Sequence, residues 1–307
     1  EVVPIQTALV TCVSEPGSDT GLDAAPFVFG PRSRAPRRTV GGGAPVGAGR
    51  TDLARLVDAV VAAHAQDGRS APRRPWPEPL PALVDLAGLR VDAPDPAVAV
   101  VALADEPSAQ SQYAVGWDLS EGGLLLLGVA GSGTTTTLLA LALSLAGRCS
   151  PDELELYALD FGVGDLAALE ALPHTGAVVA AGDRERQVRL LRRLRAELDR
   201  RRAPVVDLPR TGAVPPRIVL LLDNLAAMRA AYDDVEGLDL MDLLARVHAD
   251  GPEVGICVAI SADRPGAVPL PLSSVTTQKW LFRLADAFDY SAAGLSRNEL
   301  PAPVPGR

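Results

Sequence analysis

Short apolar runs alternate with helix-like segments along the chain from about residue 83. Several runs are unbroken stretches of Leu, Val and Ile, which is typical of parallel strands buried on both faces of a sheet. We expect strands at residues 98–103, 113–119, 124–127, 154–159, 177–180, 217–222, 254–261 and 279–284. We expect helices at residues 134–146, 165–171, 183–202, 225–232 and 238–249. This alternation predicts an α/β domain with a mostly parallel sheet and helices on both faces.

The chain before this domain has a different pattern. Residues 1–13 carry β-branched and apolar side chains in the alternation of a strand, and the Pro/Gly break after them sets off residues 1–30 as one segment. Residues 31–82 are rich in Pro, Gly and Arg, which is typical of a linker. Within this linker, Thr51 and Asp52 can cap a helix that runs to about residue 64 with an apolar stripe on one side. The α/β domain then occupies residues 83–307.

The composition is that of a folded, acidic protein. The chain has 307 residues, of which 29 are Lys or Arg and 38 are Asp or Glu, so its net charge is −9 (29 − 38). This balance opposes broad binding to nucleic acid or to anionic membranes, and any DNA contact has to be local. The three cysteines lie too far apart for a metal motif, which favours a reduced, cytosolic compartment. The apolar stretches are too short to span a bilayer, so we expect no membrane contact by this chain.

A glycine-rich turn follows the strand expected at residues 124–127. Residues 128–135 read GVAGSGTT and match the phosphate-binding motif GxxxxGK[ST] at Gly128, Gly133 and Thr135. Glycines let backbone N–H groups turn inward to hold phosphate oxygens, and the following helix adds the positive end of its dipole. Thr134 stands where the motif has lysine, and Lys279 is the chain's one lysine. Taken alone, the motif also fits a glycine-rich turn without a ligand.

A second apolar strand, at residues 217–222, ends in an acid. Asp223 follows it and can hold Mg²⁺ through water opposite Thr135. The next residue is Asn224, whose amide cannot accept the proton that a glutamate at this position would take from water. We therefore expect a phosphate-bearing ligand and Mg²⁺ at a site with an incomplete catalytic set. The candidate ligand-binding residues are Gly128, Gly131, Ser132, Gly133, Thr134, Thr135, Thr136 and Asp223.

Other charged residues leave two interpretations open. Asp160 ends a strand before a glycine turn, which fits either the edge of the site or the start of a helix. Arg264 and Arg283 follow or lie on strands near the expected site, and each is a candidate arginine finger or a surface residue. The arginines at residues 184–202 alternate with acids, which favours a solvated helix face over a nucleic-acid surface.

At this point the chain resembles the FtsK/SpoIIIE family of ring-forming motor ATPases, over roughly residues 75–307. The resemblance rests on six segments in the family's order: ADEPSAQSQ, WDLSEGGLLLLGVAGSGTT, YALDFGVGDLAALEALPHTGAVV, RIVLLLDN, ISADRPGAVP and LFRLADAFDY. It is nearest to the tandem modules of actinobacterial members and of the EccC-type ATPases of type VII secretion. The resemblance implies a RecA-like P-loop fold, ATP and Mg²⁺ as ligands, and neighbouring ATPase modules in a ring-forming homo-oligomer such as a hexamer.

The resemblance also implies how this chain departs from active members. Thr134 replaces the phosphate-binding lysine and Asn224 replaces the likely base, which implies a regulatory or structural module that hydrolyses ATP weakly or not at all. Residues 1–13 resemble the strand that closes such a module, so residues 1–30 are expected to belong to an upstream module of the same protein. Three functions stay open: a cytoplasmic module of a protein-secretion motor that handles signal peptides, a module of a DNA-translocating motor, and a scaffold whose P-loop is empty.

Overall fold

The computed structural model of the chain describes residues 51–68, 70, 76–91, 95, 97–203 and 215–295. The chain divides into two units, Glu1–Arg74 and Pro75–Arg307. In the first unit the expected helix is α1 (Asp52–Asp67), which begins where the Thr51 hydroxyl accepts a hydrogen bond from Ala54 N. The strand expected at residues 1–13 lies outside the described residues.

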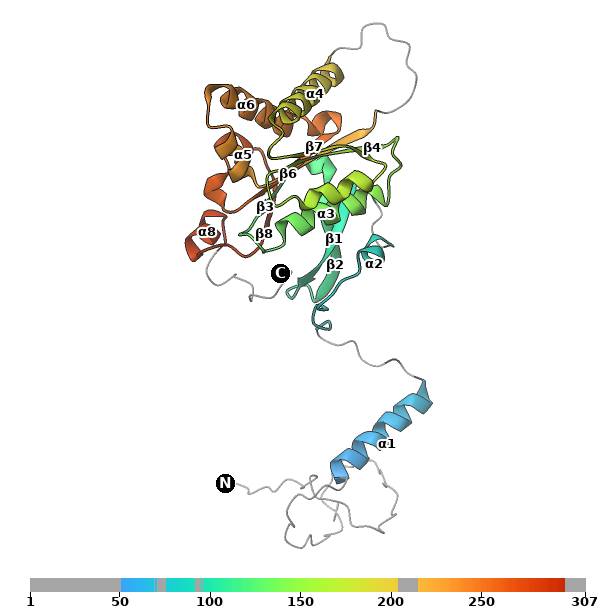
Figure 1. The fold of residues 1–307 in the computed structure, drawn as a ribbon. Coiled ribbons are helices and arrows are strands. Elements are labelled where there is room, and N and C mark those ends of the chain that lie inside the picture. The colour runs from blue at the N-terminus through green and yellow to red at the C-terminus, as the bar shows by residue number, and fades with distance from the viewer. Residues whose placement is uncertain are drawn as a thin grey trace, which may run out of the picture. The chain divides into compact units, whose positions relative to one another are not determined.

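The second unit is built on one six-stranded sheet in the order β5-β4-β6-β7-β3-β8. Every pair of neighbouring strands in this sheet is parallel, which confirms the predicted α/β class (Figure 1). The strands are β3 (Leu124–Leu127), β4 (Leu154–Asp160), β5 (Thr175–Ala180), β6 (Arg217–Asp223), β7 (Ile256–Ala262) and β8 (Gln278–Leu281). The four central strands are almost wholly buried, as their unbroken apolar sequences predict.

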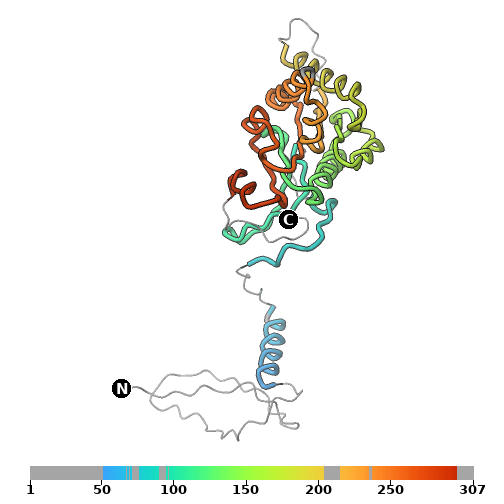
Figure 2. The backbone as a smooth tube through the Cα atoms, turned by 60° about the vertical axis from the view of Figure 1, so that its left-hand side comes forward, coloured from blue at the N-terminus to red at the C-terminus, as the bar shows by residue number. Residues whose placement is uncertain are grey.

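Helices cover both faces of the sheet and bury a separate core on each. Alternate residues of the same strand serve the two cores: Leu124 and Leu126 join one cluster, and Leu125 and Leu127 join the other. The first cluster packs under α3 (Thr134–Ala146) and the short 3₁₀ helix η2 (Asp165–Ala171). The second packs under α4 (Arg184–Arg202), α5 (Leu225–Ala231) and α6 (Val235–Asp250). Figure 2 shows the course of the backbone from a second direction.

The first two expected strands do not join the parallel sheet, which corrects their assignment to it. β1 (Val98–Glu106) and β2 (Ser111–Asp118) pair antiparallel in a sheet of their own. The reason lies in the connection, because the four residues between the strands are far too few for the crossover that parallel neighbours need. This hairpin rests on α3, where the buried Ser144 hydroxyl donates to the Val100 carbonyl at 2.8 Å.

Other differences from the expectation are local. Residues 165–171 form a 3₁₀ helix rather than an α-helix, and the last strand ends at Leu281 rather than at residue 284. Three short helices were not expected: α2 (Leu86–Val91), α7 (Leu270–Ser273) and α8 (Ala287–Ala292). None of the described helices is long and apolar enough to cross a lipid bilayer.

Candidate functional site

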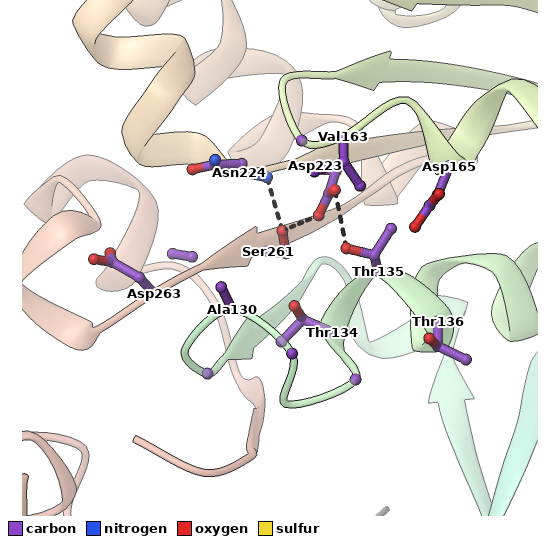
Figure 3. A pocket seen from close by; sticks show the side chains of 15 residues that line it. Ala130, Thr134, Thr135, Thr136, Val163, Asp165, Asp223, Asn224, Ser261 and Asp263 are labelled. Atoms are coloured by element: carbon purple, nitrogen blue, oxygen red, sulfur yellow. Dashed lines mark hydrogen bonds between the residues drawn. The ribbon is translucent and has the colours of Figure 1, made fainter. Parts of the chain in front are cut away.

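Four loops meet at the carboxyl ends of the parallel strands and enclose a pocket of about 450 Å³. They follow β3, β4, β6 and β7. The ends of these strands lie side by side, because Leu127 of β3 pairs with Ala262 of β7 and Asp160 of β4 pairs with Asp223 of β6. Ligands of open parallel sheets bind at this edge. Figure 3 shows the pocket, which is lined by Gly128, Ala130, Gly131, Gly133, Thr134, Thr135, Thr136, Gly162, Val163, Asp165, Asp223, Asn224, Ser261, Ala262 and Asp263. All of the predicted binding residues except Ser132 are in this set.

The glycine-rich turn has the backbone geometry of an inward-facing loop. Gly131 and Gly133 have φ angles of 76° and 105°, in the left-handed region that favours glycine. The start of the loop is fixed on both sides, because Gly128 N donates to the Ala262 carbonyl and Val129 N donates to the Arg283 carbonyl, each at 2.9 Å. α3 begins at Thr134, so the first N–H groups of this helix, which have no acceptor within it, face the pocket end of the loop.

Gly128 cannot be replaced by a larger residue without disturbing the loop. A β-carbon there would lie 2.4 Å from the Ser132 hydroxyl and 2.7 Å from Cβ of Phe282. The Ser132 hydroxyl is buried beneath the loop and has no hydrogen-bond partner among the described residues. Ser132 therefore shapes the turn from behind instead of lining its cavity.

Thr135 and Asp223 meet across the base of the pocket. The Thr135 hydroxyl donates to Oδ2 of Asp223 at 3.0 Å, although 88 positions separate the two residues in the sequence. Asp223 is 3% exposed and its other oxygen, Oδ1, accepts from the Ser261 hydroxyl at 2.5 Å. A hydroxyl and a carboxylate in this arrangement are the oxygen groups that Mg²⁺ binds directly or through water.

Asn224 does not direct its side chain into the open part of the pocket. Its φ angle is 62°, a left-handed conformation that Asn tolerates better than most residues. The side-chain carbonyl caps α5 by accepting from Ala227 N at 3.1 Å, and the amide nitrogen donates to the Phe161 carbonyl at 3.4 Å. Both ends of this amide are therefore used to hold the turn after β6.

Asp160 belongs to the turn that follows it. Of its two interpretations, the edge of the site or the start of a helix, its hydrogen bonds favour the start of the helix η2. Its carboxylate accepts from Gly162 N and Leu166 N, each at 2.9 Å, and so fixes the loop that leads into η2. This loop presses against the site, because a β-carbon on Gly162 would lie 2.3 Å from Oδ2 of Asp223. Asp160 thus positions the pocket wall from outside the cavity.

The two candidate arginine fingers are not among the described residues that line the pocket. Arg264 is exposed and lies 3.6 Å from the carboxylate of its neighbour Asp263. Arg283 lies beyond the end of β8, and its backbone carbonyl is one of the two that hold the start of the loop. Four further lining residues were not predicted: Ser261, Asp263, Asp165 and Val163. Their position at or after the carboxyl end of a strand was the available signal.

The arginine-rich helix α4 is neutralised by its surroundings, as its interleaved acids predict. Hydrogen bonds from Arg200 and Arg201 lower the pKa of Glu197 to about 2. Further ion pairs along the helix join Arg184 to Asp234, Arg189 to Glu185, Arg195 to Asp199, and Arg202 to Asp250 and Glu253. This helix does not offer the unpaired basic stripe of a DNA-binding surface.

A profile of the FtsK/SpoIIIE family matches residues 99–208. The ESX secretion system protein EccC of Geobacillus thermodenitrificans is 27% identical over 271 residues, which are 84% of this chain and 18% of that protein. This chain therefore spans about a fifth of that relative's length.

Two solved structures of similar proteins are EccC ATPases of Thermomonospora curvata. The cytoplasmic domain of the Thermomonospora curvata type VII secretion ATPase EccC has 25% identity and a TM-score of 0.68, and the match covers 86% of this chain and 33% of that chain. Thermomonospora curvata EccC (ATPases 2 and 3) in complex with a signal sequence peptide has 28% identity and a TM-score of 0.55, with coverages of 66% and 40%. These similarities agree with the RecA-like ATPase fold that the parallel sheet and its loops indicate.

Proposed function

Because this chain carries a domain of the FtsK/SpoIIIE family, we propose that it is a nucleotide-binding module of a type VII secretion motor that hydrolyses ATP weakly or not at all. The observation that carries this proposal is the 3.0 Å hydrogen bond between Thr135 and Asp223 at the base of the pocket. It joins the start of α3 to the end of β6, where a phosphate and its Mg²⁺ would meet.

Binding would rest on the backbone more than on side-chain charge. The N–H groups of the loop and of the first turn of α3 would hold the phosphates, and Thr135 with Asp223 would hold Mg²⁺. Thr134 supplies no ammonium group. A hydrogen bond to a charged group contributes about 1.5 to 3 kcal/mol, so the missing lysine would weaken binding by about one to two factors of ten.

Hydrolysis would be slow because Asn224 can neither take a proton from water nor turn toward one while it caps α5. Replacing Asn224 with Glu would not repair this defect. Glutamate at a φ of 62° is strained, and it would remove the cap of α5, at a cost of about 1 kcal/mol for the cap alone.

The test is a calorimetric titration with ATP and Mg²⁺ together with a phosphate-release assay. We expect binding at submillimolar to millimolar ATP and turnover far below one per second, both before and after Asn224→Glu. Asp223→Asn should abolish the Mg²⁺ dependence of binding. Turnover of several per second would refute the weakly hydrolysing module, and the absence of binding at millimolar ATP would favour a scaffold with an empty pocket.

We further propose that the module acts in the cytoplasm beside neighbouring ATPase modules of a longer, ring-forming protein, with secreted-protein signal peptides as its substrates. The signal sequence peptide bound to the related Thermomonospora curvata protein supports this choice. A DNA-translocating module is the alternative, and the net charge of −9 and the ion-paired arginines of α4 count against it. Retention of the module by an immobilised signal peptide, but not by duplex DNA at physiological salt, would separate the two.

A further inference from the structure

The backbone holds the glycine-rich loop at its two ends. At the start, Val129 N donates to the Arg283 carbonyl at 2.9 Å, and at the other end Gly133 is the N-cap of α3. Between these ends, the described backbone hydrogen bond of the loop stays within it and runs from Ser132 N to the Val129 carbonyl at 3.0 Å. Because glycine can adopt many backbone conformations, these bonds alone do not keep the middle of the loop turned toward the pocket.

Phe282, the first residue after β8, lies behind this loop. Its Cβ would lie 2.7 Å from a β-carbon on Gly128, and its ring atoms Cε1 and Cδ1 would lie 3.9 and 4.0 Å from a β-carbon on Gly133. In contrast, no described atom outside the adjoining residues would lie within 4 Å of a β-carbon on Gly131. The Phe282 side chain therefore reaches both ends of the loop, and it is not among the described residues that line the pocket.

The Phe282 ring is anchored in the core beneath α3. It is half-buried and packs against the same core cluster as Leu124 and Leu126. Trp280 lies two residues earlier, on the same face of the sheet, and is also half-buried against this cluster. Trp280 pairs with Leu126 of β3, before the loop begins. The two aromatic residues thus share a core, and Phe282 is the one placed at the glycines of the loop.

We propose that Phe282 is a positioning residue that holds the glycine-rich loop in its phosphate-binding form from outside the cavity. The inference rests on the proposed nucleotide-binding function, because it concerns the same loop. The side chain fills the space behind Gly128 and Gly133, so the loop cannot relax away from the pocket and its N–H groups stay turned inward without a ligand.

This support matters because Thr134 supplies no ammonium group and binding depends on the backbone N–H groups. Their arrangement then sets the affinity directly. The apparent Kd equals the intrinsic Kd divided by the fraction of molecules whose loop has the binding conformation. A change behind the loop is therefore expected to weaken binding although it touches neither phosphate nor Mg²⁺.

The first test is the Kd for ATP with Mg²⁺, measured by calorimetry on the whole chain well below the melting temperatures. Phe282→Leu removes the ring and should raise the Kd about tenfold, as expected if the loop is competent in about one molecule in ten. The matched control Trp280→Leu removes a larger ring from the same core and should change the Kd less than about twofold. Equal changes in the two variants, or an unchanged Kd in Phe282→Leu, overturn the inference while leaving nucleotide binding intact. Failure of the wild-type chain to bind at millimolar ATP overturns the proposed function and this inference with it.

Hydrogen exchange of the nucleotide-free protein separates positioning from general destabilisation. The amides of Val129 and Ser132 are hydrogen-bonded, so in Phe282→Leu a peptide covering residues 128–133 should exchange at least about threefold faster while a peptide from β6 does not change. Trp280→Leu should leave the loop peptide unchanged. Uniformly faster exchange across the sheet in Phe282→Leu would show that Phe282 is a core residue alone and would overturn the proposal.

A milder pair of variants serves if Phe282→Leu does not fold. Phe282→Met keeps an unbranched apolar side chain and should raise the Kd for ATP about threefold, and Trp280→Met should leave it unchanged. The same Kd in Phe282→Met as in the wild type, with faster exchange nowhere in the loop, would overturn the proposal.

Discussion

The hydroxyl of Ser261 joins Asp223, the last residue of β6, to Asn224, which follows it. It is 3% exposed, donates to Oδ1 of Asp223 and accepts from the backbone N–H of Asn224. Because the Ser261 hydroxyl holds Oδ1, the other carboxylate oxygen of Asp223, Oδ2, faces the Thr135 hydroxyl. Ser261 is thus a positioning residue, because it orients the carboxylate that would meet Mg²⁺ without lying at the phosphates itself.

Removal of this hydroxyl should change the Mg²⁺ requirement of nucleotide binding. In Ser261→Ala the carboxylate of Asp223 loses its buried donor and can rotate, so we expect the Mg²⁺ concentration at half-maximal binding to rise about tenfold, which corresponds to about 1.4 kcal/mol. Binding measured in EDTA should change less than twofold. The measurement is a calorimetric nucleotide titration across a series of Mg²⁺ concentrations.

The matched control is Ser144→Ala, which removes another fully buried serine hydroxyl whose partner is Val100 on the hairpin. Each variant should lose roughly 1 kcal/mol of stability for one broken hydrogen bond. If Ser144→Ala shifts the Mg²⁺ requirement as much as Ser261→Ala does, the role of Ser261 is general stabilisation and the positioning role is refuted.

The contrast between Asp223 and Ser261 shows what a sequence can predict about a site. An acid at the end of an apolar strand is conspicuous, because burial of an unpaired carboxylate is costly and needs a reason. A serine within an apolar strand is small and common, and its importance depends on a neighbour 38 positions away. Similarly, the hydrogen bond from the Asn224 amide to the Phe161 carbonyl could not be predicted, because the two residues are 63 positions apart in the sequence.

At the scale of the elements, buried strands and long helices follow directly from the sequence. β3 and α3 have the predicted bounds, because an unbroken apolar strand, a glycine turn and a run of good helix formers leave little ambiguity. The β1–β2 hairpin was wrongly expected in the parallel sheet, although the mixed polar and apolar residues of β2 and the four-residue connection are typical of an antiparallel pair. Its actual place depends on distant contacts, including two hydrogen bonds between the Gln278 amide and the backbone of Asp118.

One arginine shows how the end of α4 is tied to its neighbours. The Arg201 side chain is 6% exposed and donates to the carbonyls of Val254 and Pro216 at 2.9 Å and to Glu197 at 2.6 Å. It thereby joins α4 to the start of β6 and to the turn before β7. In the sequence, nothing distinguishes Arg201 from the other arginines among the nine of this helix. Its structural role is seen only once the elements are packed together.

At the scale of the whole molecule, we propose that residues 1–30 belong to an upstream module, as the family resemblance implies. Deletion of residues 1–30, or of the whole first unit Glu1–Arg74, should then change the melting temperature of the α/β unit by less than about 2 °C. Differential scanning calorimetry of the three chains measures this. A fall of more than about 10 °C, which corresponds to several kcal/mol in a domain of this size, would show that residues 1–30 are part of this module's own core.

Acid should destabilise the α/β unit through His248, a buried histidine on α6. Its side chain is 2% exposed, and Nε2 donates to the Thr276 hydroxyl at 2.6 Å, because that hydroxyl gives its own proton to the Leu272 carbonyl. Nδ1 is buried without a partner among the described residues, and a β-carbon on the adjacent Gly123 would collide with the ring. Burial lowers the pKa of His248 from 6.5 to about 4.

The sign of the effect follows from this depressed pKa. The unfolded chain binds a proton at His248 below about pH 6.5 while the folded chain does not until about pH 4, so stability is full above pH 6.5 and is lost as the pH falls toward 4. Between pH 6.5 and 4.5 the loss from this residue should be about 2 kcal/mol. Urea unfolding at several pH values measures it. His248→Gln should flatten the dependence of the free energy of unfolding on pH in this window. The control His64→Gln, at an exposed histidine on α1, should leave it unchanged. Equal slopes for the wild type and His248→Gln would mean that the buried ring finds a proton acceptor on folding and that its pKa is not depressed.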